Sequence, residues 1–254
     1  MSQRVLTALP VYNEAKYVAS VVSEVRRYSP EVLVVNDGSN DGTGELLAAI
    51  DGIHRVTHTR NLGYGAALRS AFDFAQAHRY EVLVTIDCDG QHQPRRIPRF
   101  VAACAGWDIV SGSRYLEASS GESAPPPERR KINEELTAEL NRTLGLKLTD
   151  AFCGFKAYRV AALGHLHITE TGWGMPLQLW VQAARLGLRV KEVGVPRLYL
   201  DPNRAFGGML NDAAERLAYY RRVIQDALAE TGAHPAVGHG PHRHACPSER
   251  GSCR

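Results

Sequence analysis

Residues 82–91 read Val-Leu-Val-Thr-Ile-Asp-Cys-Asp-Gly-Gln, an apolar and β-branched run that ends in two acidic residues one position apart. The run predicts a buried strand. Because positions i and i+2 of an extended chain point to the same side, Asp87 and Asp89 would converge just past the end of that strand. Two carboxylates there suit Mg²⁺ or Mn²⁺, and Gln91 offers a third oxygen one such step further. Taken alone, the segment is also explained as a polar loop without a metal.

The composition is that of an ordinary globular protein, since 44% of the 254 residues are hydrophobic and 22% are charged. The net charge of +3 is too small to indicate a nucleic-acid partner. The five cysteines form neither a paired framework nor a zinc spacing, which favours a reducing cytosol. We expect neither a signal peptide nor a membrane span, because no apolar run approaches the ~20 residues that a bilayer requires. The sequence thus predicts a cytoplasmic protein with, at most, peripheral contact at the inner face of a membrane.

Strands and helices alternate along the chain, which implies an α/β fold with a mostly parallel sheet covered by helices on both faces. The predicted strands are 5–10, 32–35, 55–59, 82–86, 108–111, 190–195 and, as a strand and turn, 152–160. The predicted helices are 15–28, 44–50, 65–78, 128–144, 175–186 and one from about 208 to 230. Residues 1–230 are therefore expected to form one domain.

Three segments, one in the middle of the chain and two at its end, have alternative interpretations. Residues 116–127, rich in Ser, Gly and Pro, are either a mobile lid or a plain connector. The last helix is amphipathic, and we expect it to pack on its own domain rather than on a membrane. Residues 231–254 are rich in His, Gly and Pro; we expect a disordered tail rather than a soft-metal site.

Polar segments follow several of the predicted strands, at the sheet edge where α/β proteins bind ligands. They include Leu-Pro-Val-Tyr-Asn-Glu at 9–14 and Val-Val-Asn-Asp-Gly-Ser-Asn-Asp-Gly-Thr at 34–43, each of which alone is also explained by a helix cap. We expect Asp37 to accept hydrogen bonds from a base or ribose. The glycines of Arg-Asn-Leu-Gly-Tyr-Gly at 60–65 would let the backbone approach a ligand. Arg114, within Ser-Gly-Ser-Arg-Tyr at 111–115, is suited to bind phosphate bidentately.

In this order and at these spacings, the segments make the chain resemble the family 2 glycosyltransferases with the GT-A fold. Within that family it is most similar to the polyprenyl-phosphate (dolichyl-phosphate) mannosyl- and glucosyltransferases. The resemblance extends from about residue 5 to 208 and includes Thr-Asp-Ala-Phe-Cys-Gly-Phe-Lys-Ala-Tyr at 149–158. It implies a Rossmann-like catalytic domain and metal-dependent, inverting transfer of mannose or glucose to polyprenyl phosphate. The donor would be a nucleotide sugar of the GDP-mannose or UDP-glucose type.

The resemblance also implies roles for individual residues. The nucleoside would be held by Pro10, Tyr12, Glu14 and Asp37. The divalent metal and the diphosphate would be bound by Asp87, Asp89 and Gln91. Phosphate groups of donor or acceptor would meet Arg114 and Arg130. Asp150 would lie near the sugar and acceptor, and Arg204 would contact the diphosphate from a loop, so the expected catalytic residues are Asp89, Asp150 and Arg204.

The expected chemistry depends on the acceptor. A phosphate acceptor is already ionised, whereas a hydroxyl acceptor would need a carboxylate base such as Asp150. A soluble hydroxyl or glycan acceptor is the alternative, favoured by the lack of the two membrane helices that often follow the domain in relatives. A nucleotide-sugar-binding protein without catalysis is less consistent with the intact acidic residues and arginines.

Two positions depart from the family: Gln178 stands where relatives usually carry glutamate, and Asn36 where close relatives carry aspartate.

Overall fold

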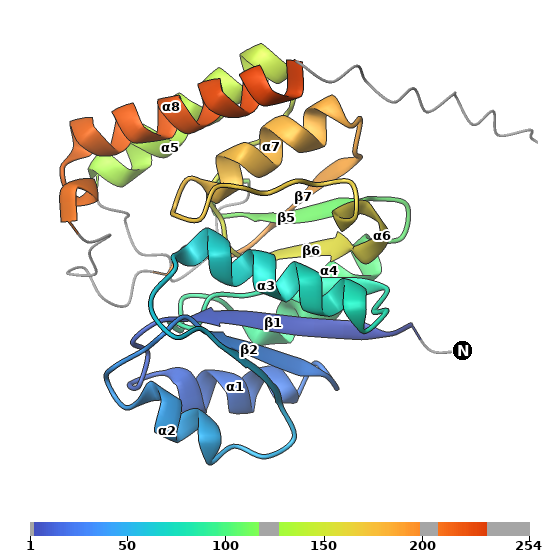
Figure 1. Ribbon diagram of the computed structural model, residues 1–254. Coiled ribbons are helices and arrows are strands. Elements are labelled where there is room, and N and C mark those ends of the chain that lie inside the picture. Colours follow the sequence, from blue (N-terminus) through green and yellow to red (C-terminus); the bar gives the residue numbers. More distant parts are fainter. Residues whose placement is uncertain (1–2, 117–126, 199–207, 233–254) are drawn as a thin grey trace, which may run out of the picture.

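A seven-stranded sheet forms the centre of the molecule in a computed structural model that describes residues 3–116, 127–198 and 208–232 (Figure 1). Its strand order is β3-β2-β1-β4-β6-β5-β7. The strands are β1 (Val5–Val11), β2 (Val32–Asn36), β3 (His54–Thr57), β4 (Val82–Thr85), β5 (Ile109–Ser113), β6 (Lys156–Arg159) and β7 (Val190–Gly194).

The sheet is mostly parallel, as the sequence predicts. Strand β1 pairs in parallel with β2 and β4, β2 with β3, and β5 with β7. Strand β6 lies antiparallel between β4 and β5, an orientation that the sequence pattern did not indicate. The carboxyl ends of β1, β2, β4 and β5 consequently meet at one edge of the sheet.

Helices cover both faces of the sheet because the strand side chains alternate between two cores. Leu6 and Ala8 belong to one core, whereas Leu9 and Val11 belong to the other. The first core is closed by α3 (Tyr64–Ala77), α5 (Pro127–Leu144), α6 (Val160–Leu163), α7 (Met175–Arg185) and α8 (Ala213–Gly232). The second core is closed by α1 (Val18–Arg26), α2 (Thr43–Ala48) and α4 (Ile97–Ala103). Short 3₁₀ turns η1 (Pro94–Arg96) and η2 (Gly208–Asn211) precede α4 and α8.

Most predicted elements exist, and their ends differ where polar groups hold the chain in loops. The predicted strand and turn at 152–160 contains a strand only at Lys156–Arg159, because the preceding residues form a loop against Asp87 and Asp150. The helix predicted at 15–28 begins at Val18 and ends at Arg26. Most of the 116–127 segment, interpreted as a lid or a connector, lies outside the described residues, as do Arg204 and the tail from residue 233.

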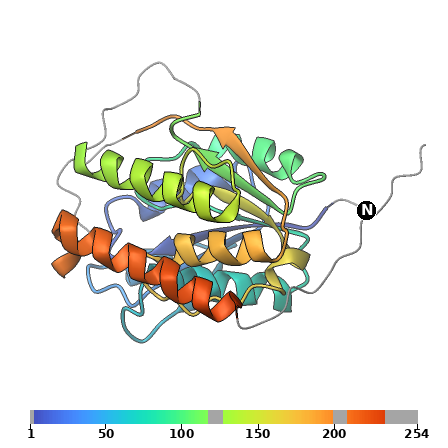
Figure 2. The ribbon, with the colours of Figure 1, turned by 90° about the horizontal axis from the view of Figure 1, so that it is seen from above.

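Helix α8 packs on its own domain, beside α5 and α7, as Figure 2 shows. Its apolar residues Val223 and Ile224 are buried, and Arg221 forms ion pairs with Glu135 and Glu139 of α5. The apolar face of the helix is therefore part of the core, as expected. Within the three described ranges, the chain forms no helix that is long and apolar enough to cross a membrane.

The packing of Phe100 in the second core leads to a testable prediction about stability. Phe100 is fully buried and stacks on Phe155 with ring centroids 4.1 Å apart. We expect Phe100→Ala to lower the free energy of unfolding by about 3–5 kcal/mol, because it removes buried surface and leaves a cavity. Leu46→Ala is the matched control, since Leu46 is 40% exposed and its loss should change stability by no more than about 0.5 kcal/mol. Urea unfolding measures both, and equal losses would contradict the assigned core.

Candidate functional site

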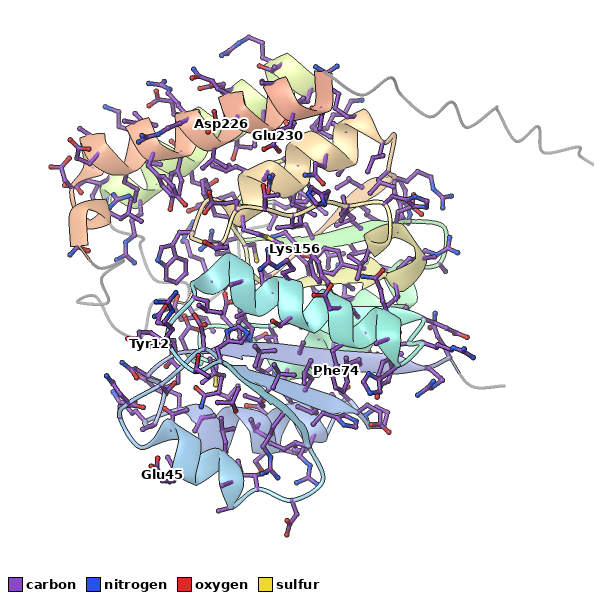
Figure 3. The ribbon with its side chains drawn as sticks, in the orientation of Figure 1. Tyr12, Glu45, Phe74, Lys156, Asp226 and Glu230 are labelled. Atoms are coloured by element: carbon purple, nitrogen blue, oxygen red, sulfur yellow. The ribbon has the colours of Figure 1, made fainter. Side chains whose placement is uncertain are left out.

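A pocket of about 730 Å³ opens at the sheet edge where the parallel strands end. Segments that follow β1, β2, β4 and β5 line it, together with parts of α3, α5, α7 and α8. Tyr12, labelled in Figure 3, lies at this edge just after β1, and 43% of it is exposed. Of the residues predicted to bind the donor or metal, the pocket lining includes Pro10, Tyr12, Glu14, Asp37, Asp87, Asp89, Gln91 and Arg114.

Side-chain hydrogen bonds fasten the segment after β1 to the segment after β2. Asn13, which has a positive φ of 55°, donates its backbone N–H to Ser39 Oγ at 2.9 Å. Its side-chain oxygen accepts from the backbone N–H of Asn40 at 2.9 Å. Glu14 donates its backbone N–H to Thr43 Oγ1 at 3.0 Å. These contacts hold the Pro10–Glu14 wall of the pocket in a fixed position.

Asp37 is almost fully buried, and its carboxylate holds the segment before α3. Oδ1 accepts from the backbone N–H of Leu62 at 2.9 Å and lies 2.6 Å from His58 Nδ1. Oδ2 accepts from the backbone N–H of Gly63 at 2.8 Å. These three contacts of the carboxylate are with the protein itself, and hydrogen bonding to a base or ribose stays a prediction.

Asp87 and Asp89, which follow β4, both line the pocket. Asp87 Oδ1 accepts from the Tyr64 hydroxyl at 3.1 Å, and Oδ2 lies 3.3 Å from His92 Nε2. A side chain at Gly154 would collide with the Asp87 carboxylate, because its Cβ would stand 2.1 Å from Oδ2. Asp89 Oδ1 accepts from the backbone N–H of Gln91 at 3.0 Å.

The donor atoms around Asp87 and Asp89 fit one particular kind of metal site. The described part of the chain holds no group of three or more His, Cys, Asp and Glu side chains arranged around a common metal position. Proteins usually bind Mg²⁺ through one or two carboxylates, while phosphate oxygens of a substrate and waters supply the other ligands. Two carboxylates at the wall of an open pocket match this pattern. A cation shared with a phosphate-bearing ligand fits these residues; a closed structural metal site does not.

Asp150 is fully buried and forms a bidentate ion pair with Arg114, which follows β5. The two hydrogen bonds measure 2.7 and 2.9 Å, and Asn133 Nδ2 and the Phe152 backbone N–H also donate to Oδ1. Burial alone would raise the pKa of Asp150, but the charge and hydrogen bonds of Arg114 lower it well below its ordinary value. Arg114 lines the pocket, yet two of its guanidinium nitrogens are directed at Asp150, a partner that sequence reasoning did not identify.

Lys156 is a buried basic residue outside the pocket lining. It lies on β6 and is 3% exposed, and Figure 3 shows it in the interior of the molecule. Its Nζ donates to the backbone oxygen of Cys153 and stands 5.5 Å from the centroid of the Trp180 ring. Burial lowers the pKa of Lys156. We assigned no role to Lys156 from the sequence, because a single lysine in a short strand does not indicate a buried charge.

The glycines before and within the start of α3 approach another protein segment. Cβ atoms added at Gly63 and Gly65 would stand 2.3 Å from the backbone oxygens of Thr171 and Glu170, respectively. Gly63 also has a positive φ of 107°. Both glycines therefore allow a close approach of the 170–171 backbone, and Gly63 also lines the pocket, so the approach of a ligand stays a prediction.

Two further residues differ in position from what the sequence suggested. Arg130 is half exposed and forms a 2.7 Å ion pair with Glu134, whereas its neighbour Arg129 lines the pocket. Gln178 is buried on α7 outside the pocket lining, where it binds the backbone N–H groups of Thr169 and Glu170. The replacement of a glutamate by Gln178 therefore affects how the 169–170 loop is held, and it does not change a residue of the pocket lining.

Comparison with known proteins gives consistent matches. Residues 7–166 match the model of Glycosyl transferase family 2. The chain is 35% identical over 222 residues to undecaprenyl-phosphate mannosyltransferase of Micrococcus luteus, covering 83% of this chain and 90% of the relative. It is 34% identical over 206 residues to polyprenol monophosphomannose synthase of Mycolicibacterium smegmatis, covering 76% and 77% of the two chains.

Solved structures show the same fold. Glucosyl-3-phosphoglycerate synthase from Mycobacterium tuberculosis in complex with uridine diphosphate matches with a TM-score of 0.67 at 21% identity, over 96% of this chain and 85% of that chain. A structure of the same enzyme with Mn²⁺, uridine diphosphate and glucosyl-3-phosphoglycerate has a TM-score of 0.66 at 20% identity, over 93% and 82%. The family model covers more than half of the chain, and the two relatives align over most of their length. This chain therefore belongs to glycosyl transferase family 2 and is a glycosyltransferase with the GT-A fold.

Proposed function

We propose that this glycosyltransferase moves mannose or glucose from a nucleotide sugar to polyprenyl phosphate, with inversion, in the presence of Mg²⁺ or Mn²⁺. The observation that carries the proposal is the pair Asp87 and Asp89 in a pocket that is also lined by arginines and by aromatic and apolar side chains. The names of the two relatives, both acting on polyprenyl or undecaprenyl phosphate, support the acceptor class and favour mannose.

The donor would occupy the half of the pocket beside β1 and β2. Pro10, Tyr12, Glu14 and Asp37 line this half and are proposed to hold the nucleoside. Asp87, Asp89 and Gln91 would hold the cation, with oxygens of the donor diphosphate as further ligands. The cation would neutralise negative charge that grows on the leaving diphosphate. The uridine diphosphate and Mn²⁺ in the M. tuberculosis enzyme of the same fold support this arrangement in general.

Arginines would assist at the diphosphate and the acceptor phosphate. Arg129 lines the pocket from α5 and takes over the role that the sequence suggested for Arg130. Arg114 also lines the pocket, and its pairing with Asp150 would fix its orientation before substrate arrives. The predicted diphosphate contact of Arg204 is part of the same proposal.

The acceptor would occupy the other half of the pocket, which is lined by Ile132, Phe152, Trp173, Leu198 and Tyr220. An apolar wall beside basic groups suits a phosphate attached to a hydrocarbon chain. A phosphate oxygen of the acceptor would attack the anomeric carbon from the side opposite the diphosphate. The bond between that carbon and the diphosphate oxygen would break, and its electron pair would leave with the nucleoside diphosphate.

The state of Asp150 favours a phosphate acceptor over a hydroxyl acceptor. An ionised phosphate needs no proton removed before it attacks. A hydroxyl needs a base whose pKa lies near the working pH, but the pKa of Asp150 is lowered far from that range by Arg114. Asp150 is therefore proposed to position Arg114. Peripheral contact with a membrane surface follows from the proposed lipid acceptor.

A donor screen tests the proposed function. GDP-mannose and UDP-glucose would be supplied separately with Mn²⁺, and nucleotide release would be measured with and without polyprenyl phosphate in detergent. We expect release to be stimulated by the lipid phosphate, and the lipid product to carry the inverted anomer. Release stimulated only by water-soluble hydroxyl acceptors would contradict the proposal and favour the soluble-acceptor alternative.

The metal assignment predicts that Asp89→Ala loses at least about 10-fold to 100-fold in activity, the loss typical even of groups that only support a metal ligand. The fold should persist, because Asp89 lies in a loop at the wall of an open pocket, where it accepts a hydrogen bond from the backbone N–H of Gln91 in the same loop. Asp51→Ala is a control, since Asp51 is an exposed acid outside the pocket. Full wild-type activity in excess chelator would disprove the requirement for a cation.

The Asp150–Arg114 pair predicts a specific pH dependence of stability. We expect Asp150→Asn to lower the free energy of unfolding by about 3–5 kcal/mol, because Arg114 loses its buried partner. The pKa of Asp150 is lowered on folding, so its contribution is complete above its ordinary value of 3.8 and is lost only as the pH falls below it. The deficit should thus be constant between about pH 8 and about pH 6. Urea unfolding across this range measures it; a deficit that shrinks near neutrality would restore Asp150 as a candidate base.

A further inference from the structure

We propose that Tyr64 and Trp173 are positioning residues for Asp87, and that a loop anchored by α7 and α8 keeps them in place. This inference rests on the proposed function, in which Asp87 is a ligand of the divalent cation. Beyond the cation ligands themselves, it identifies residues that hold Asp87 in place and connect the cation site to α8, the last described helix. The loop comprises residues 169–174 and is called the 169–174 loop below.

The first link is between Tyr64 and Asp87. The hydroxyl of Tyr64, the first residue of α3, donates to Asp87 Oδ1 at 3.1 Å. Its ring stacks on the Trp173 ring, with centroids 5.0 Å apart and planes inclined by 15°. Both rings line the pocket beside Asp87. Because stacking restricts the rotation of the phenol ring, Trp173 fixes the direction from which the hydroxyl reaches the carboxylate.

The second link is between the 169–174 loop and its neighbours α7 and α3. Gln178 Oε1 accepts from the backbone N–H groups of Thr169 and Glu170, both at 2.9 Å, and Nε2 donates to Thr169 Oγ1 at 2.6 Å. The backbone oxygen of Thr171 accepts from the N–H of Ala66 at 3.1 Å. A single buried amide and the first turn of α3 thereby hold the loop that carries Trp173.

The third link is between the loop and α8. Tyr219 donates its hydroxyl to Glu170 Oε1 at 2.6 Å and accepts from the backbone N–H of Gly174 at 3.2 Å. A Cβ at Gly172 would stand 2.7 Å from this hydroxyl, and one at Gly174 would stand 2.8 Å from Val223 Cγ2. The glycines on both sides of Trp173 therefore let the loop lie directly on α8.

These links give Asp87 an ordered set of supporting contacts. Tyr64 contacts one carboxylate oxygen and His92 lies beside the other, so the carboxylate plane is set before a cation arrives. Groups that orient a metal-binding carboxylate typically contribute 10-fold to 100-fold to affinity or activity. A loss of the Tyr64 hydroxyl or of the Trp173 ring should therefore weaken cation binding without removing a ligand.

The test compares Mn²⁺ binding in Tyr64→Phe, Trp173→Ala and Trp173→Phe. Free Mn²⁺ would be measured by electron paramagnetic resonance in the presence of GDP and, separately, UDP. We expect about 10-fold to 100-fold weaker binding in Tyr64→Phe and Trp173→Ala. Trp173→Phe should restore most of the affinity because it keeps an aromatic partner for Tyr64. Tyr80→Phe is the matched control, since Tyr80 donates to Glu31 at the opposite end of the sheet.

Tyr64→Phe separates positioning from general stability, because it keeps the ring and the stack. Weaker Mn²⁺ binding with a melting temperature close to that of Tyr80→Phe would support the inference. Wild-type affinity in both Tyr64→Phe and Trp173→Ala would overturn it while leaving the proposed function intact. Absence of Mn²⁺ binding in the wild-type protein, with either nucleotide, would overturn both the inference and the cation site of the proposed function.

Discussion

The buried ion pair between Asp150 and Arg114 is the interaction on which the site depends. It joins the segment after β5 to the 149–155 loop, and Asn133 of α5 binds the same carboxylate. That loop carries Gly154, whose missing side chain leaves room for the Asp87 carboxylate. An unpaired charge at either position would be costly in the interior, so the pair sets one geometry for three separate parts of the chain.

The position of Asp87 follows from contacts on both sides. Gly154 lies behind its carboxylate, Tyr64 donates to one oxygen, and His92 lies beside the other. The residues around it come from the segment after β4, from α3 and from the loop before β6, which meet at one edge of the sheet. A ligand held in this way has little freedom to lose when substrate binds, which is the basis of preorganised catalysis.

The sequence was sufficient to predict the features that depend on local pattern. Alternating strands and helices predicted the mostly parallel sheet, and Asp87 and Asp89, expected beyond the end of a buried strand, both line the pocket. It could not supply partners that only the fold creates, such as Asp150 for Arg114 or the 170–171 backbone for Gly63 and Gly65. The assignment to Arg130 instead of Arg129 had another cause. Adjacent residues on a helix point about 100° apart, and the sequence does not show which of them faces the pocket.

Helix α8 illustrates why an amphipathic pattern leaves function open. By sequence alone, its basic and apolar residues are compatible with a membrane surface as well as with the surface of its own domain, which is the packing we expect. In the structure, Arg221 bridges to two glutamates of α5, Ile224 is buried, and Tyr219 reaches the loop that carries Trp173. The helix therefore completes the core and supports one wall of the pocket at once. A polyprenyl acceptor would have to approach through the pocket opening, because the apolar face of α8 is already committed to the interior.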